Sequence, residues 1–297
     1  MRRRYRRIGW LLVAPATIFL LALTVFPFLY MIYMSFFQYN LAQGIEPRFI
    51  GLGNYRNIFS DPTVSDTVEF TAVLTIFALP IEMLLGFAIA LLVRETVGES
   101  LWRALILLPM MVPAVVAGIA WKMLYNYQFG PLNYMLSLLG IEKVSWLGQS
   151  VPARAGVIII DVWQWTPFVF LVLYAGLQSV PVDLIDSAKV DGASRWGITR
   201  YVELPLVLPL ALVVLILRLI DVLKLFDIVY MTTYGGPGTA TYSYSFYIYN
   251  VGFAFGFDVG YGAALSILLL IVVTILVNAL MRLVRLDELL QLKEVAA

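Results

Sequence analysis

The 297-residue sequence contains no cysteine and no histidine. These two absences exclude disulfide bonds, thiol nucleophiles, zinc sites built from cysteine and histidine, and acid–base chemistry that relies on an imidazole. Charged residues are also scarce, at 13% of the chain, which is about half their share in a soluble domain. The net charge of +1 gives no general attraction to nucleic acid. Because hydrophobic residues make up 61% of the sequence, we expect an integral membrane protein.

Six apolar runs are long enough to cross a bilayer, since a helix needs about 20 residues to span the hydrocarbon core. These runs cover residues 9–37, 66–93, 101–124, 154–178, 206–230 and 260–284. No internal repeat and no separate soluble domain are evident. The sequence therefore predicts an all-α integral membrane protein with six transmembrane helices, forming a single transmembrane domain over residues 1–297.

The basic segment MRRRYRR precedes the first apolar run. That run is too long for a signal peptide and has no small-residue cleavage pattern, so we interpret it as a retained anchor. With a cytoplasmic N-terminus, the cytoplasmic side holds Arg2, Arg3, Arg4, Arg6, Arg7, Arg94, Arg103, Lys189, Arg195, Arg200, Arg282, Arg285 and Lys293. The opposite side holds only Arg48, Arg56, Lys122, Lys143 and Arg154. The excess of basic residues predicts that both termini are cytoplasmic.

Residues 181–205 form a polar, charged segment between two apolar runs, and the same orientation makes this segment cytoplasmic. Pro181 suits the start of a helix, and Asp183 suits the positive end of the helix dipole. Gly192 lies in the middle of the segment and can adopt a positive φ, which permits a sharp turn. The pattern predicts a short helix–turn–helix that projects from the membrane.

The spacing in this segment resembles the cytoplasmic coupling loop of ABC importer permeases. In that loop, Glu-Ala-Ala is followed by three residues, glycine, nine residues and Ile-x-Leu-Pro. The corresponding positions here are Asp186-Ser187-Ala188, Gly192 and Val202-Glu203-Leu204-Pro205, with no gap. The aspartate and serine depart from the family pattern, and the acidic group is retained on a shorter side chain. The resemblance implies contacts with an ATPase from Asp186, Ser187, Ala188, Asp191, Gly192, Trp196, Leu204 and Pro205.

Further segments resemble the carbohydrate branch of these importers, and in particular permeases of the maltose type. They are Phe49–Tyr55, Tyr125–Asn133, Asp161–Trp163 and Phe226–Gly238. Together with the coupling loop, they extend the resemblance over nearly the whole chain.

The resemblance implies that this chain forms half of a heterodimeric path for a sugar, such as a di- or oligosaccharide. The other members would be a second homologous permease, a dimer of an ABC ATPase and an extracytoplasmic sugar-binding protein. The chain has no G-x-x-x-x-G-K-[ST] phosphate loop, so ATP and magnesium would be bound by the ATPase, and this chain is expected to be neither an enzyme nor a cofactor protein. The expected location is a bacterial or archaeal cell membrane.

The fifth apolar run contains four charged residues at spacings of three, Arg218, Asp221, Lys224 and Asp227. Such neighbours on a helix can form ion pairs, and charges within a span avoid lipid. Two interpretations remain open: a ladder of ion pairs against the partner permease, or a polar lining for the sugar path.

Other polar residues also occur within the spans. Glu82 follows Pro80, where the proline leaves a backbone carbonyl without its usual donor. Asp161, Trp163 and Gln164 lie in the fourth apolar run. Each of them is interpreted either as part of the path or as a partner for a neighbouring helix.

Three alternatives have different sequence requirements. A secondary transporter commonly shows internal repeats and has no use for the 181–205 segment. An intramembrane enzyme needs a catalytic set that the histidine-free sequence does not offer. An ABC importer for another solute, such as a glycerol phosphodiester or a polyamine, is compatible with the coupling loop.

Overall fold

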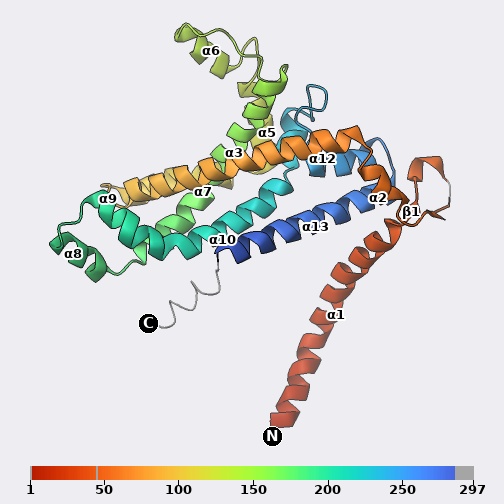
Figure 1. The fold of residues 1–297 in the computed structure, drawn as a ribbon, viewed down its shortest axis with the longest axis horizontal. Helices are drawn as coiled ribbons and strands as arrows, with labels where there is room; N and C mark the ends of the chain where they lie inside the picture. The colour runs from red at the N-terminus through yellow and green to blue at the C-terminus, as the bar shows by residue number, and fades with distance from the viewer. Residues whose placement is uncertain (1, 45, 285–297) are drawn as a thin grey trace. The chain divides into compact units, whose positions relative to one another are not determined.

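The computed structural model describes residues 2–44 and 46–284 and is almost entirely helical (Figure 1). Two of the basic residues counted above, Arg285 and Lys293, lie outside the described residues. Internal contacts divide the chain into two units. One unit comprises residues up to 61 together with 248–271, and the other comprises residues 62–247 and those from 272 onward.

The first unit begins with the long helix α1 (Arg2–Met34). A short antiparallel pair, β1 (Phe37–Gln38) and β2 (Arg48–Phe49), encloses the turn η1 (Leu41–Gln43) and precedes α2 (Gly53–Ile58). The unit also contains the π-helical turn η3 (Asn250–Ala254) and the first half of α13 (Val259–Val284).

Asn40 joins the two stretches of this unit. Its side chain accepts from the amides of Ala42 and Gln43, and its Nδ2 donates to the carbonyl of Gly256 at 2.7 Å. Gly260 packs so closely that an added Cβ would overlap the Phe37 carbonyl oxygen. The backbone of Phe37 therefore leaves no room for a side chain at position 260.

The second unit contains most of the remaining helices. They are α3 (Pro62–Val93), α4 (Glu99–Met111), α5 (Ala114–Leu124), α6 (Pro131–Leu138), α7 (Ser150–Gln178), α8 (Val182–Val190), α9 (Arg195–Ile198), η2 (Thr199–Glu203, a π-helical turn), α10 (Leu204–Leu223) and α11 (Asp227–Thr232). Helix α12 (Tyr244–Tyr249) follows, with its last two residues in the first unit.

Helices α3, α7 and α10 pack side by side and form the core of this unit (Figure 1). Gly86 of α3 allows the close approach, since an added Cβ would lie 2.6 Å from Val169 Cγ1 and 2.9 Å from the Phe170 backbone nitrogen on α7. Phe70, Leu74 and Ile160 are fully buried between α3 and α7. The three helices therefore form a rigid frame on which polar side chains can be held.

Five helices among the described residues are long and apolar enough to cross a membrane, and a sixth crossing arises if α4 and α5 count as one span. The prediction of an all-α membrane fold is confirmed. The third span, predicted as a continuous run over 101–124, is in fact broken, because α4 and α5 are bent by 92° at the Val112–Pro113 junction. Pro113 has no N–H to continue the helix, and it restricts Val112 to an extended conformation.

The fifth span also differs from the prediction of residues 206–230. Helix α10 ends at Leu223, and α11 begins a separate turn at Asp227. The first span, predicted over residues 9–37, corresponds to Leu12–Met34 within α1, the part of that helix that is long and apolar enough to cross a membrane.

Candidate functional site

A polar pocket of about 240 Å³ lies beside α7 and α10 in the second unit. Its lining consists of Ala114, Asp161, Trp165, Arg218, Asp221, Lys224, Leu225, Phe226, Asp227 and Ile228. Five of these ten side chains are ionisable and two are aromatic, although the surrounding helices are strongly apolar. The pocket therefore gathers five ionisable side chains from α7, α10 with its C-cap residue Lys224, and the start of α11.

Arg218 is the largest fully buried side chain of the pocket, at 1% exposure. Its Nε and Nη2 donate to the two carboxylate oxygens of Glu82 on α3, at 2.8 and 2.9 Å. Nη2 also donates to Asp161 Oδ2 on α7 at 2.9 Å. The guanidinium lies 4.8 Å from the ring centroid of Trp165, within the range of a cation–π contact.

These contacts explain why charged residues occur inside apolar helices. A buried charge is tolerated when it is paired and hydrogen-bonded, and a bidentate arginine–carboxylate pair provides both. Glu82, Asp161 and Arg218, which we call the arginine cluster, come from three different helices. The cluster fixes α3, α7 and α10 in one relative position and holds Asp161 at the pocket wall.

Within this chain, the four charges of the fifth span do not form a continuous ladder of ion pairs. Arg218 pairs with carboxylates of two other helices, and Asp221 and Lys224 are about half exposed and form only a loose pair at 3.8 Å. Asp227 lies in the first turn of α11. The helix ends before the ladder is complete, and the carboxylates of α3 and α7 are better placed for the buried guanidinium.

Two other predicted residues of the fourth span have structural partners and do not line the polar pocket. Gln164 is buried, and its Nε2 donates to the carbonyl oxygen of Val112 at 2.9 Å. That carbonyl lies at the break between α4 and α5. Trp163 packs edge-on against Trp121 of α5, with ring centroids 5.5 Å apart. Trp165, which sequence reasoning missed, is the tryptophan that lines the pocket, and its proximity to Arg218 depends on tertiary packing.

The 181–205 segment folds as predicted into two short helices, α8 and α9, joined by a turn. Gly192 has φ of 78°, and an added Cβ would meet no atom of the chain within 4 Å. The requirement for glycine therefore comes from the left-handed backbone and not from crowding within this chain. Asp186 pairs with Lys189 at 2.9 Å on the exposed surface of α8.

The predicted coupling residues are nearly all accessible. Exposed positions are Asp186, Ser187, Asp191, Gly192, Trp196, Leu204 and Pro205, and Ala188 is half-buried. Leu204 and Pro205 form the first turn of α10. The segment therefore leads directly into the helix that holds Arg218.

A buried ion pair beneath this segment escaped the sequence analysis. Glu203 is fully buried and accepts from Arg94 Nη2 at 2.6 Å and from Thr199 Oγ1 at 2.9 Å. Arg195 of α9 contacts Glu95 at the end of α3. Both contacts join the 181–205 segment to the region where α3 ends. The only feature of the sequence that pointed to these contacts was the acidic residue Glu203 directly before the apolar run that forms α10.

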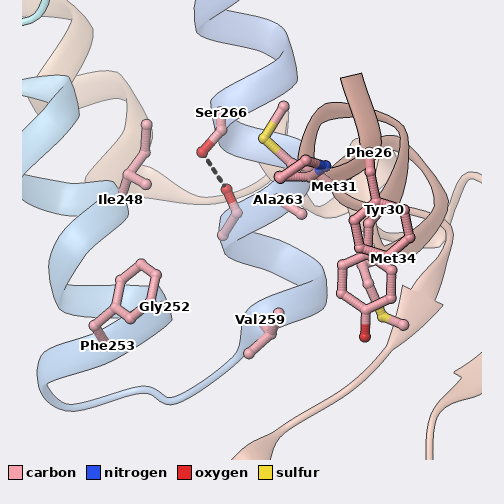
Figure 2. A pocket seen from close by; sticks show the side chains of 12 residues that line it. Phe26, Tyr30, Met31, Met34, Ile248, Gly252, Phe253, Val259, Ala263 and Ser266 are labelled. Atoms are coloured by element: carbon pink, nitrogen blue, oxygen red, sulfur yellow. Dashed lines mark hydrogen bonds between the residues drawn. The ribbon is translucent and has the colours of Figure 1, made fainter. Parts of the chain in front are cut away.

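The first unit contains an apolar groove of about 280 Å³ between α1 and the 248–266 stretch (Figure 2). Figure 2 shows Phe26 and Tyr30 of α1 on one side and Ile248 and Phe253 on the other. Ser266 Oγ donates to the Gly262 carbonyl oxygen at 2.8 Å, so the hydroxyl is already used within its own helix. The groove offers apolar surface and little polar chemistry.

Comparison with known proteins assigns the family. Proteins described as binding-protein-dependent transport system inner membrane components match residues 82–286. The chain is 36% identical to the trehalose/maltose transport system permease protein MalF of Thermococcus litoralis, over 81% of each chain. It is 37% identical to the trehalose transport system permease protein SugA of Mycobacterium tuberculosis, covering 80% of this chain and 76% of that protein.

Other relatives carry different solute names. The sulfoquinovosyl glycerol transport system permease protein SmoG of Agrobacterium fabrum is 36% identical, covering 79% of this chain and 77% of that protein. Among solved structures, a chain of a bacterial alginate ABC transporter has the same fold, with a TM-score of 0.79, 23% identity and 95% of each chain covered. The chain therefore belongs to the family of inner membrane components of binding-protein-dependent transport systems and is a multi-spanning membrane permease.

Proposed function

We propose that this chain is a permease subunit of an ATP-driven importer for a di- or oligosaccharide. It would form half of a heterodimeric path with a second, homologous permease. Two copies of an ABC ATPase would supply the energy, and an extracytoplasmic binding protein would deliver the sugar. No covalent chemistry is assigned to this chain.

The exposed 181–205 segment carries this proposal. In this segment Val182, Val190 and Trp196 are 65%, 88% and 67% exposed. Large apolar side chains gathered on a short polar helical segment are typical of a surface that another protein covers. We assign that partner as the ATPase, which makes the segment and both termini cytoplasmic, in agreement with the distribution of basic residues.

The carbohydrate assignment rests on two independent supports. Relatives at 36–37% identity are named for trehalose and maltose. The polar pocket combines carboxylates, a lysine and the aromatic rings of Trp165 and Phe226. Sugars offer hydroxyl groups for hydrogen bonds and C–H faces for packing on rings, so this lining suits them.

The buried contacts beneath the segment give a route for the motion. Closure of the ATPases on ATP would draw the 181–205 segments of the two permeases together. Glu203 is bonded to Arg94 at the end of α3, and Leu204 begins α10. A displacement of the segment would therefore move α3 and α10 as a pair and re-orient the path between its inward-facing and outward-facing states.

Copurification and transport test the proposal. The tagged chain, expressed with its neighbouring permease and ATPase genes, is expected to retain both proteins through purification in detergent. The isolated chain should show no ATP hydrolysis above background. Proteoliposomes with the full complex and its binding protein should accumulate radiolabelled trehalose or maltose only with internal ATP. Appreciable ATPase activity of the isolated chain, or no carbohydrate uptake by the full complex, would refute the assignment.

A further inference from the structure

The polar pocket contains a buried carboxylate oxygen that is free to accept a hydrogen bond. Asp161 is fully buried, and its Oδ2 accepts from Arg218. Its Oδ1 has no hydrogen-bond partner among the described residues. Leaving a buried acceptor unpaired is costly, and nearly all such groups in proteins find a partner. Because Asp161 lines the pocket, a donor on an occupant of the pocket would satisfy this oxygen.

The charges around the pocket are predominantly negative. Four carboxyl groups belong to the set, since Asp161, Asp221 and Asp227 line the pocket and Glu82 lies behind Arg218. Two basic groups, Arg218 and Lys224, oppose them, which leaves a formal charge of −2. An anion would therefore meet net repulsion.

The buried cation is already engaged. Nε and Nη2 of Arg218 donate to Glu82 and Asp161, and the guanidinium lies over the ring of Trp165. An anionic solute would have to displace these contacts to use the arginine. Lys224 is half exposed and lies 3.8 Å from Asp221, so its charge is partly compensated as well.

We infer that this pocket selects neutral, hydroxyl-rich solutes and rejects anionic ones, with Asp161 Oδ1 accepting a hydrogen bond from a solute hydroxyl. The inference rests on the proposed function and narrows its substrate class to uncharged carbohydrates. Asp161 is then a specificity-determining residue, and Glu82 is a positioning residue that acts through Arg218.

The test compares a neutral and an anionic probe of the same skeleton, trehalose and trehalose 6-phosphate. Uptake of each is measured in proteoliposomes that hold the full complex and its binding protein. The wild type is compared with the double variant Asp221→Asn/Asp227→Asn, which removes two charges without changing side-chain shape. Both probes are first shown to bind the binding protein, so that its own preference, which is the same in both complexes, cancels from the comparison. Glu142→Gln, an exposed charge-removing change on the α6–α7 connection, is the matched control.

The expected result is wild-type uptake of trehalose with little uptake of the phosphate. In the double variant the ratio of phosphate to neutral uptake should rise about tenfold, because two partly screened charges near the path have been removed. The control should leave the ratio unchanged. An unchanged ratio in the double variant, or equal uptake of both probes by the wild type, would overturn the inference and leave the proposed function standing. Absence of uptake of either probe by the wild type would overturn both.

A second variant tests the hydrogen bond itself. In Asp161→Asn, Arg218 still requires an acceptor, so the amide oxygen faces the guanidinium and the NH₂ group replaces Oδ1 in the pocket wall. The KM for trehalose should rise about tenfold, because a charge-assisted bond is replaced by a neutral one. A structural role of Asp161 would instead lower the yield of assembled complex or change its basal ATPase rate, so both are measured. An unchanged KM at normal yield would exclude Asp161 as a solute contact.

Discussion

Removing the carboxylate of Glu82 should destabilise the complex far more than removing that of Asp221. Both residues were candidates for buried pairing, but the structure separates them. Glu82 is fully buried and holds Arg218 through two bonds of 2.8 and 2.9 Å. Asp221 is about half exposed and pairs loosely with an exposed lysine. Glu82→Ala leaves the guanidinium with Asp161 as its remaining carboxylate partner.

The expected magnitudes follow from these environments. Breaking a buried ion pair by removing one partner costs about 3–5 kcal/mol. Glu82→Gln keeps the shape and one acceptor oxygen, so its cost should be closer to the 1–3 kcal/mol of a hydrogen bond to a charged group. Asp221→Ala should cost less than about 1 kcal/mol, as exposed pairs do. For a chain of this size, the Glu82→Ala variant should melt about 10 °C below the wild type.

The assay is the loss of the monodisperse complex on size-exclusion chromatography after heating in detergent. We expect the order wild type, Asp221→Ala, Glu82→Gln, Glu82→Ala from highest to lowest midpoint. The triple variant Glu82→Leu/Asp161→Leu/Arg218→Leu removes all three charges of the arginine cluster and should recover part of the loss. If Glu82→Ala melted within about 2 °C of Asp221→Ala, the arginine cluster would not stabilise the frame of α3, α7 and α10, and the reasoning would fail.

Three further outcomes are expected. Gly192→Leu should abolish uptake while the protein still inserts normally into the membrane. The control is Gly140→Leu, at an equally open position with φ of 73°, which introduces the same backbone strain of about 1–2 kcal/mol and should transport normally. Equal loss of uptake in both variants would show that backbone strain alone causes the effect. Glu203→Gln should weaken the bond to Arg94 and lower the coupling ratio of sugar transported per ATP, measured in proteoliposomes, without lowering the ATPase rate of the detergent-solubilised complex. Gly86→Val should force α3 and α7 apart and sharply lower the yield of folded chain, since the Cβ alone would overlap Val169; normal yield would contradict the packing described here.

Local features of the sequence predicted the helices and the 181–205 segment correctly because their causes are local. An apolar run of sufficient length has few alternatives to a helix in a bilayer. Gly192 was placed in a turn from its sequence context, and its φ of 78° agrees. The ends of spans were predicted less well, since hydropathy continues through Val112–Pro113 and beyond Leu223 although the helices do not.

The site required information that no local pattern contains. Glu82, Asp161 and Arg218 were each singled out as charges within spans, but their partnership joins positions 136 and 57 residues apart. The spacing of three in the fifth run suggested a ladder on one helix, and the stronger attraction came from neighbouring helices. The buried pairing of Glu203 with Arg94 and the place of Trp165 in the pocket were not predicted, because an acidic residue before a helix and a tryptophan in a span are common features.

The break between α4 and α5 gives the third span an articulation within the membrane. A helix interruption at membrane depth exposes a carbonyl that lipid cannot satisfy, and Gln164 of α7 supplies the missing donor to Val112. Gly118 of α5 lies against Met231 of α11, so α5 and α11 are packed as one piece beyond the corner. Swinging that piece relative to α4 and α7 would require the exchange of this amide bond, worth about 1 kcal/mol, and would also separate Trp121 from Trp163. Ala114, the first residue after the corner, borders the polar pocket, so the same swing would change the width of the pocket mouth.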